Sequence, residues 1–272
     1  ARGDLDDFSP LTAFRKTRDE GRAYDPALWA EMAQMGWAGV LVDEANGGSD
    51  MGHRAAYILA EEMGRTLAAS PFIPSAVIAA TTLRAAGSDR LASVASGEAL
   101  YALALDEGAK FAPERTALQA RADGNAFRLS GAKAFVAEGS TAGRLLVLAR
   151  TSGTAGEAQG LTLFDIDADR AGLTQDSIGT IDYRDFTAIT FDDVEATGDD
   201  VLGEVGDGLA ALAPGLRAGQ AALAAAKAQA AKEEKEHNRA VLEAAQARAF
   251  PWDFPWDSPW DFPWDSPWDP SP

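Results

Sequence analysis

The sequence of 272 residues contains no cysteine and only two histidines, His53 and His237. A chain without cysteine has neither a disulfide nor a thiolate nucleophile, and two histidines far apart in the sequence cannot build a zinc cluster. No stretch approaches the roughly 18 consecutive apolar residues of a membrane span. The beginning, ARGDLDDF, lacks the apolar region of a signal peptide. We therefore expect a cytoplasmic protein without a metal site.

Positive charge is also scarce. The 24 lysines and arginines stand against 42 aspartates and glutamates, which gives a formal net charge of −18. Nucleic acids and anionic membranes bind proteins through positively charged surfaces, so the charge balance excludes both as partners. Hydrophobic residues make up 46% of the chain, enough for a buried core, and the length corresponds to about two domains.

Strand signals are densest in residues 99–139. Residues 99–105 form a short apolar run, and residues 116–122 alternate between small or apolar and polar side chains. Asp123-Gly124-Asn125 predicts a tight turn, because glycine and asparagine tolerate a positive φ. The chain then returns through residues 126–137, with Gly131 predicting a bulge. The pattern indicates an antiparallel sheet.

Helical patterns flank this region. Asp25-Pro26 is a strong helix start, because aspartate can cap the free amides and proline loses no hydrogen bond at the first helical position. In the next helix, residues 54–67, we expect Tyr57, Ile58 and Met63 to face the core. Further helices are predicted at residues 11–18, 74–86 and 88–95, and further strands at 145–149, 161–166 and 188–194.

Helices and strands thus follow each other in blocks, which predicts an α+β protein and not a doubly wound parallel sheet. The glycines of residues 203–208 have the wrong order for a phosphate-binding loop, so we interpret them as a loop that caps the next helix. From Leu209 the chain is helical again, and Pro214 is expected to kink or end the first segment. Between Ala224 and Ala240 no apolar side chain is larger than alanine, which leaves little core-forming face.

Residues 250–272 repeat a four-residue Pro-Trp-Asp pattern that holds five of the seven tryptophans. Proline at every fourth position excludes a helix and a central strand, and leaves turns or extended segments. The segment is either a multivalent docking tail or a low-complexity stretch foreign to the fold, and we favour the second. The predicted domains are a helical domain (1–98), a central antiparallel β domain (99–202), a partial C-terminal helical segment (203–249) and this tail.

Five stretches in order resemble the acyl-CoA dehydrogenase family, over about residues 20–210. They look like its N-terminal helix with a Gly-Gly loop, its Glu-Glu-x-Gly-Arg helix, its Thr-Glu-Pro segment, its Gly-x-Lys-x-Trp-Ile-Thr strand, and the strand and loop before its C-terminal helices. Each is weak alone, but their order and spacing are specific. They are DPALWAEMAQMGWAGVLVDEANGGSDMG, AAYILAEEMGRTLAASPF, LDEG, LSGAKAFVAEG and ITFDDVEATGDDVLGEVGDG.

The resemblance implies a flavoprotein in which FAD lies between the β domain and the C-terminal helices. The implied reaction is α,β-dehydrogenation of an acyl-CoA thioester, in which a glutamate removes a proton and flavin accepts a hydride. The residues that the resemblance places at the flavin are Leu105, Asp106, Glu107, Phe135, Val136 and Ala137.

This chain departs from the family pattern at that site. Asp106 replaces a threonine whose hydroxyl approaches the flavin, and its charge would oppose the negative charge that flavin gains on reduction. Ala137 replaces a second hydroxyl residue, whereas Phe135 can still supply an aromatic wall. Ala109-Lys110-Phe111 replaces the Gly-Ser-Asp turn of the family.

The resemblance leaves the catalytic base unknown. The family's C-terminal flavin contact and catalytic glutamate are not found, and residues 208–232 contain no acidic residue. The carboxylates that remain, Glu233, Glu234, Glu236 and Glu243, lie on a charged helix with no apolar wall to raise a pKa.

Three hypotheses follow. The chain is an acyl-CoA dehydrogenase-like oxidoreductase of fatty acid metabolism with acyl-CoA as substrate, a base-lacking subunit of a heteromeric dehydrogenase, or an artificial chain with the fold but no activity. The first allows a homo-oligomer and the second requires a hetero-oligomer.

Overall fold

The computed structural model describes residues 2–180 and 185–249. The chain divides into two compact units, Ala1–Ala231 and Lys232–Pro272. The first unit holds all the described strands together with α1 to α6 and the first part of α7 (Gly208–Ala249). The predicted tail, residues 250–272, lies outside the described residues. The expected α+β class is confirmed, and the predicted domain boundaries stay predictions.

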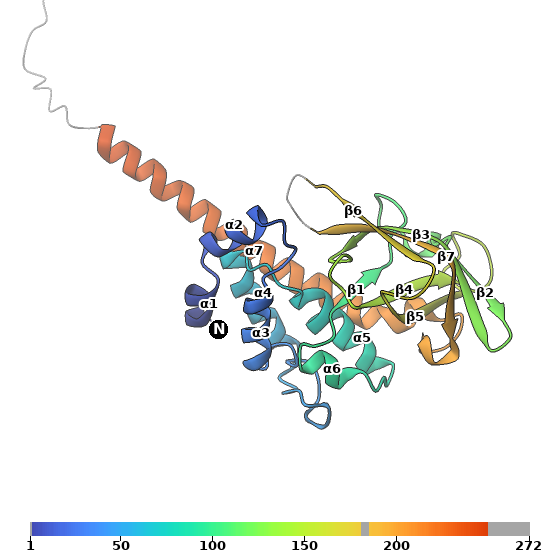
Figure 1. Ribbon diagram of the computed structural model, residues 1–272. Helices are drawn as coiled ribbons and strands as arrows, with labels where there is room; N and C mark the ends of the chain where they lie inside the picture. The colour runs from blue at the N-terminus through green and yellow to red at the C-terminus, as the bar shows by residue number, and fades with distance from the viewer. Residues whose placement is uncertain (1, 181–184, 250–272) are drawn as a thin grey trace, which may run out of the picture. The chain divides into compact units, whose positions relative to one another are not determined.

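The first hundred residues are helical, as predicted (Figure 1). The start signal at Asp25-Pro26 is confirmed, since the Asp25 carboxylate accepts a hydrogen bond from the Ala27 amide at 2.9 Å. The helical elements are α1 (Arg2–Phe8), α2 (Leu11–Asp19), α3 (Pro26–Gln34), η1 (Glu44–Asn46), α4 (Gly52–Thr66), η2 (Phe72–Ala79), α5 (Ala80–Ala85) and α6 (Leu91–Ala95).

Two helices differ from the prediction. On α4 the buried face consists of Ala56, Leu59, Ala60 and Met63, one position away from Ile58, which is 50% exposed. The prediction that Ile58 faces the core was therefore wrong. The helix expected at residues 74–86 divides into η2, which is a π-helix, and the α-helix α5.

The strands form one eight-stranded sheet in the order β6-β7-β3-β2-β4-β5-β8, with β1 paired to β4. Most pairs are antiparallel, as predicted. Two pairings are parallel and correct the expectation of an antiparallel sheet: β1 with β4, and β2 with β4 at Gln119 and Arg150. The strands are β1 (Tyr101–Ala104), β2 (Gln119–Asp123), β3 (Ala126–Ala137), β4 (Arg144–Arg150), β5 (Leu161–Asp167), β6 (Leu173–Ile178), β7 (Phe186–Thr197) and β8 (Val201–Leu202).

The hairpin of β2 and β3 forms where the turn signal predicts it. Asp123 pairs with Ala126 across Gly124, whose φ is +62°. The bulge expected at Gly131 is confirmed by a register shift against β7, and a second shift lies between Lys133 and Val136. The sequence prediction missed β6, because its mostly polar sequence LTQDSI shows no buried alternation.

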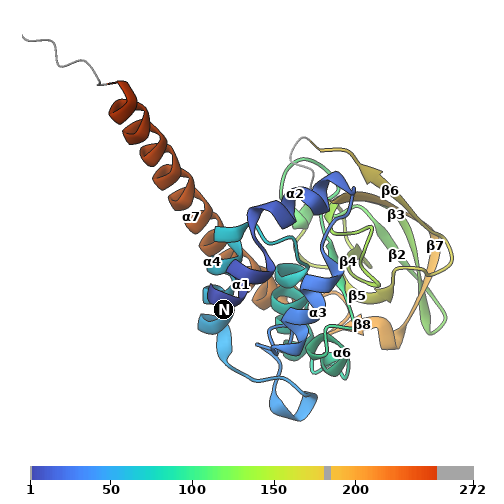
Figure 2. The same ribbon diagram turned by 60° about the vertical axis from the view of Figure 1, so that its left-hand side comes forward.

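Strand β4 connects two layers of the core. Leu146 and Leu148 pack with the helices, whereas Leu145 and Val147 pack with the far side of the sheet. Side chains alternate between the faces of a strand, so a strand that is buried on both faces reads as a continuous apolar run. Figures 1 and 2 show the helices α3 to α6 gathered to one side of the sheet.

Glycines bring α7 close to the helical part. A Cβ atom on Gly64 of α4 would lie 2.1 Å from the carbonyl oxygen of Ala226, and one on Gly215 would lie 2.1 Å from the Thr82 hydroxyl. These contacts leave no room for a side chain. Helix α7 begins at Gly208, as the capping-loop interpretation expects, and continues through Pro214, so this proline does not end it.

Candidate functional site

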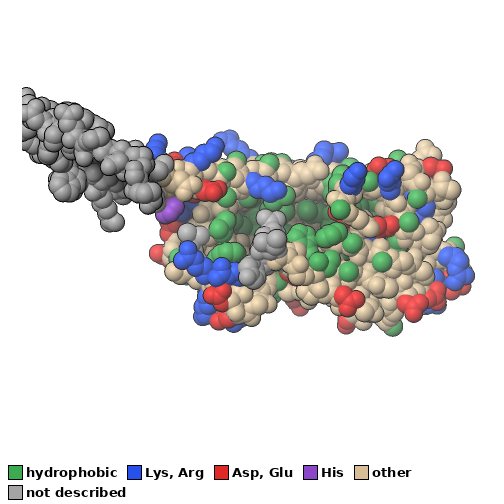
Figure 3. All heavy atoms as spheres, turned by 90° about the horizontal axis from the view of Figure 1, so that it is seen from above, with side chains coloured by type: hydrophobic (Ala, Val, Ile, Leu, Met, Phe, Trp, Pro, Cys, Tyr) green, Lys and Arg blue, Asp and Glu red, His purple; other side chains and the backbone are tan. Residues whose placement is uncertain are grey.

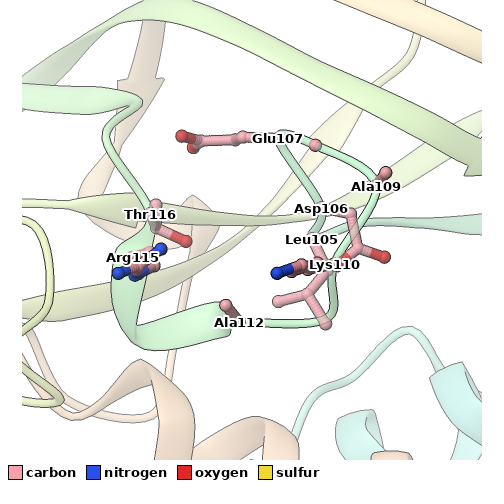
Figure 4. A pocket seen from close by; sticks show the side chains of 9 residues that line it. Leu105, Asp106, Glu107, Ala109, Lys110, Ala112, Arg115 and Thr116 are labelled. Atoms are coloured by element: carbon pink, nitrogen blue, oxygen red, sulfur yellow. The ribbon is translucent and has the colours of Figure 1, made fainter.

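The loop between β1 and β2 surrounds an open pocket of about 260 Å³ (Figure 4). This volume is below the roughly 300–1,000 Å³ of sites that enclose a drug-sized ligand, so the pocket can hold only part of a larger molecule. The residues that line it are Leu105, Asp106, Glu107, Gly108, Ala109, Lys110, Ala112, Arg115 and Thr116.

A buried ion pair fixes the beginning of this loop. The ammonium of Lys133 on β3 is fully buried and donates to the Glu107 carboxylate at 2.8 Å and to the Leu105 carbonyl at 3.0 Å. The two oxygens of Glu107 also accept the amides of Ala117 and Leu118, at 2.7 and 2.9 Å. One carboxylate thus connects the loop after β1 to β3 and to the start of β2.

These contacts control the ionisation of Glu107. Burial opposes the charged form, but the hydrogen bond and charge of Lys133 and the two backbone amides outweigh burial and lower the pKa of Glu107. Its carboxylate therefore stabilises the folded state above the ordinary pKa of 4.5, and this contribution is lost as the pH falls below that value.

We accordingly expect Glu107→Gln to destabilise the protein most at neutral pH. The difference in unfolding free energy between the wild type and the variant should shrink as the pH falls below 4.5, because the wild-type carboxylate becomes protonated. Urea unfolding at a series of pH values measures this difference. A difference that is the same at pH 7 and at acid pH would contradict the assignment.

The carboxyl group of Asp106 lies in the pocket wall and has incomplete hydrogen bonding. Its Oδ1 atom is buried and has no hydrogen-bond partner among the described residues. Burial raises the pKa of Asp106, and the charge of Lys133 opposes this only in part. A raised pKa favours the neutral carboxyl group, which can donate as well as accept a hydrogen bond.

The second bulge of β3 presents an aromatic ring next to this loop. Phe135 has a left-handed backbone with a φ of +53° and is 44% exposed, while Val136 beside it is buried. The Ala134 amide donates to the Asp106 carbonyl at 2.8 Å, which ties the bulge to the pocket loop. The ring meets Phe186 of β7 edge to face, with 6.4 Å between the centroids.

The structure thus brings the sequence-predicted residues together in part. Leu105, Asp106 and Glu107 line the pocket, and the segment from Phe135 to Ala137 lies on the neighbouring strand, with Ala137 exposed. Glu107 is held by Lys133 and by backbone amides. Their role in binding a cofactor stays a prediction.

Sequence reasoning missed the cations of the site. Lys110 and Arg115 line the pocket, and Lys133 lies buried behind Glu107. A lysine within an otherwise apolar strand pattern was the available signal for Lys133. No comparable signal marks Lys110, which lies in the irregular loop, or Arg115, which ends the short 3-10 helix η3 (Pro113–Arg115).

A buried arginine holds the far wall of the pocket. Arg150 at the end of β4 is 1% exposed. Its guanidinium donates to five backbone carbonyls, at distances between 2.8 and 3.3 Å, and two of them flank Arg115 in the wall of the pocket. The acceptors are the carbonyls of Glu114, Thr116, Ser152, Glu157 and Gln159.

The residues that the structure describes give little support to a metal site, to a membrane-spanning helix or to a catalytic base on α7. They contain no group of histidine, cysteine or acidic residues that could hold a metal ion. No helix within residues 2–180 and 185–249 has the length and apolar character needed to cross a membrane. Glu234 and Glu236 are exposed on the part of α7 that belongs to the second unit, and no side chain is described for Glu243.

The surface seen in Figure 3 has a hollow in which hydrophobic side chains gather, between the helical elements and the strands. Charged side chains lie mostly around its rim in this view. An apolar depression with a few polar groups is the common form of a ligand site.

The sequence is similar to known oxidoreductases. Residues 10–94 match the family described as "Acyl-CoA dehydrogenase, N-terminal domain". The 3-(aryl)acrylate reductase of Clostridium sporogenes is 28% identical over 231 residues, which cover 79% of this chain and 61% of that protein. The short-chain specific acyl-CoA dehydrogenase of Megasphaera elsdenii is 30% identical over 208 residues, which cover 70% of this chain and 54% of that protein. The chain therefore spans between about half and three-fifths of the length of these relatives.

The fold is also that of solved structures. Butyryl-CoA dehydrogenase from Megasphaera elsdenii superimposes with a TM-score of 0.76 at 22% identity, over 84% of this chain and 63% of that chain. At this identity the likeness concerns the fold.

Proposed function

Because the chain belongs to the acyl-CoA dehydrogenase family, we propose that it is a flavoprotein that binds FAD and takes part in the α,β-dehydrogenation of an acyl-CoA thioester. The observation that carries the proposal is Phe135, an exposed aromatic ring on a strand bulge that is tied to the pocket loop. Flavin accepts a hydride in such reactions.

The residues present suit a flavin. An exposed ring can stack on a planar heterocycle and is covered by it. The buried Oδ1 of Asp106 lacks a hydrogen-bond partner among the described residues, and a polar ring edge could supply one. Burial raises the pKa of Asp106, which favours the neutral carboxyl group, a group that could donate a hydrogen bond to the flavin. Leu105, Val136 and Ala137 would complete the apolar surroundings.

A base-lacking subunit of a heteromeric enzyme is the second candidate. Residues 208–232 contain no acidic residue, and Glu107 is occupied by Lys133 and two amides. In such an assembly a partner would supply the carboxylate that removes the substrate proton.

The visible absorption spectrum of the purified protein tests both candidate functions. We expect a bound flavin spectrum after addition of FAD, and bleaching by an acyl-CoA if this chain provides its own base. A flavin that binds but never bleaches would favour the base-lacking subunit. A protein that stays colourless in excess FAD would overturn the proposal.

A pair of variants tests the role of Phe135. Phe135→Ala should weaken FAD binding about 2- to 10-fold, the magnitude of a lost aromatic contact. Phe8→Ala, which removes a ring of similar exposure (47%) from α1, should leave FAD binding unchanged. Equal effects of the two variants would argue against stacking by Phe135.

A further inference from the structure

We propose that Asp165 is the centre of a charged latch that fixes how the helices pack on the sheet and holds the strand that leads into the pocket. Asp165 lies on β5 and is 1% exposed. Three side chains from other segments meet its carboxylate, namely Tyr101 of β1, Arg144 of β4 and Arg90, which directly precedes α6. We call these four residues the Asp165 latch.

Both carboxylate oxygens of Asp165 are in use. Oδ1 accepts a hydrogen bond from Nε of Arg144 at 2.8 Å. Oδ2 accepts the hydroxyl of Tyr101 at 3.1 Å and lies 3.5 Å from Nε of Arg90. A buried carboxylate without such donors would be very unfavourable, and Arg144 and Tyr101 would lose this acceptor if Asp165 were replaced. The four side chains therefore depend on one another.

Asp165 lies on the face of the sheet that the helices cover. Leu161 and Leu163 of the same strand pack with the helices, whereas Phe164 and Ile166 pack with the far side of the sheet. Side chains alternate between the two faces of a strand, which places Asp165 with Leu161 and Leu163. The latch thus lies at the contact between helices and sheet, beside its apolar core.

A charged group at this contact determines the arrangement of the helices and the sheet more than their attraction. Apolar side chains attract each other in many orientations, because hydrophobic burial is not directional. The hydrogen bonds and ion pairs of one buried carboxylate are satisfied in a single arrangement. The latch accordingly fixes the position of Arg90 and α6 relative to β1 and β5.

Tyr101 extends this control to the pocket. Its amide donates to Oγ of the buried Ser75 on η2 at 2.9 Å, while its hydroxyl donates to Asp165. Strand β1 ends at Ala104, and the residues that line the pocket begin at Leu105. None of the four latch residues lines the pocket, so they are positioning residues, and the latch does not depend on the proposed function.

A row of alternating charges continues the latch toward α7. Arg144 also pairs with Asp167, whose carboxylate pairs with Arg170 at 3.2 Å. Arg170 pairs with Asp200 at 2.6 Å, and Asp200 directly precedes β8. Because Arg170 and Asp200 keep each other when Asp165 is lost, we expect its replacement to affect the segments of Arg90 and Tyr101 and not the end of the row at Asp200.

Hydrogen–deuterium exchange of the full chain, followed by mass spectrometry, tests the latch. Asp165→Asn keeps the size of the side chain but removes its charge. We expect the backbone amides of residues 86–104 to exchange about 10- to 100-fold faster in this variant, because a lost hydrogen bond to a charged group favours local opening by this factor. Strands β6 and β7, at the far edge of the sheet, should exchange as in the wild type.

Asp193→Asn is the matched control. The side chain of this aspartate on β7 is 60% exposed and pairs with Arg121 at 3.7 Å, so its loss should leave the exchange of residues 86–104 unchanged. Wild-type exchange of residues 86–104 in Asp165→Asn would overturn the proposal. An equal acceleration in all strands would also overturn it, since that result describes a general loss of stability.

Tyr101→Phe tests the latch even if Asp165→Asn does not fold. It removes one hydroxyl and keeps the ring, so residues 86–104 should exchange about 2- to 10-fold faster than in the wild type. In the Asp165→Asn background the same change should have a smaller effect, because the charged acceptor is already gone. Unchanged exchange in Tyr101→Phe, or equal effects in both backgrounds, would contradict the latch.

Discussion

Replacing Lys133 with methionine should lower the free energy of unfolding by roughly 3–5 kcal/mol. The substitution keeps the length of the side chain but removes the fully buried ammonium, which leaves the partly exposed Glu107 carboxylate without its cation. The Leu105 carbonyl also loses a hydrogen-bond donor, since Lys133 donates to it at 3.0 Å. Urea unfolding at neutral pH measures the loss.

A double-mutant cycle separates the ion pair from other effects of the change. Lys133→Met combined with Glu107→Gln should be less destabilised than the sum of the two single variants, because no uncompensated charge remains. Lys227→Met, at an exposed position of α7, is the matched control and should change stability by no more than about 0.5 kcal/mol. Additive effects, or a Lys133→Met variant as stable as the control, would show that the pair does not fix the loop.

Replacing Arg150 with leucine should lower the free energy of unfolding by about 4 kcal/mol. The guanidinium satisfies five carbonyls from two loops, and each buried carbonyl that loses its donor costs about 1–3 kcal/mol. Because water can reach some of these carbonyls, the loss of unfolding free energy should be smaller than the summed cost of five carbonyls without a donor. Chemical unfolding of the variant measures the effect.

Arg150→Lys distinguishes hydrogen bonding from charge alone. Lysine retains the positive charge but has only three donors, so it cannot reach all five carbonyls and should recover only part of the stability. Arg121→Leu removes an arginine that is 73% exposed from β2 and should stay within about 0.5 kcal/mol of the wild type. If the Arg150→Lys variant were as stable as the wild type, the positive charge and not the set of guanidinium donors would account for the stabilisation.

Arg150 also connects stability to the pocket. Its acceptors include the carbonyls of Glu114 and Thr116, the two neighbours of Arg115 in the chain. Loss of these bonds would release the wall that positions Arg115.

Local sequence signals predicted the local structure well. The Asp25-Pro26 start became the cap of α3, and Asp123-Gly124-Asn125 became the turn of the β2–β3 hairpin. Such elements depend on groups only a few residues apart, whose geometry the chain fixes by itself. The block order of helices and strands was enough to give the α+β class.

The same signals failed where contacts between distant parts of the chain determine which face is buried and which strands pair. Helical spacing showed that α4 has an apolar face, but packing against the rest of the fold selected the stripe of Ala56, Leu59, Ala60 and Met63 and left Ile58 exposed. The polar strand β6 forms because β7 offers it a partner, not because of its own pattern. Likewise, the parallel pairing of β1 with β4 depends on a segment more than 40 residues away in the chain.

By itself, the sequence therefore determined the class of the fold and the resemblance to its family, and it predicted the stretch that forms the candidate site. Only the tertiary structure decided how that site is built. Lys133 reaches Glu107 across 26 positions, Arg150 reaches Thr116 across 34, and Lys110 and Arg115 come to face one pocket. The physical reason is that burial and charge pairing depend on which segments meet in space, whereas turns and helix caps depend on neighbours along the chain.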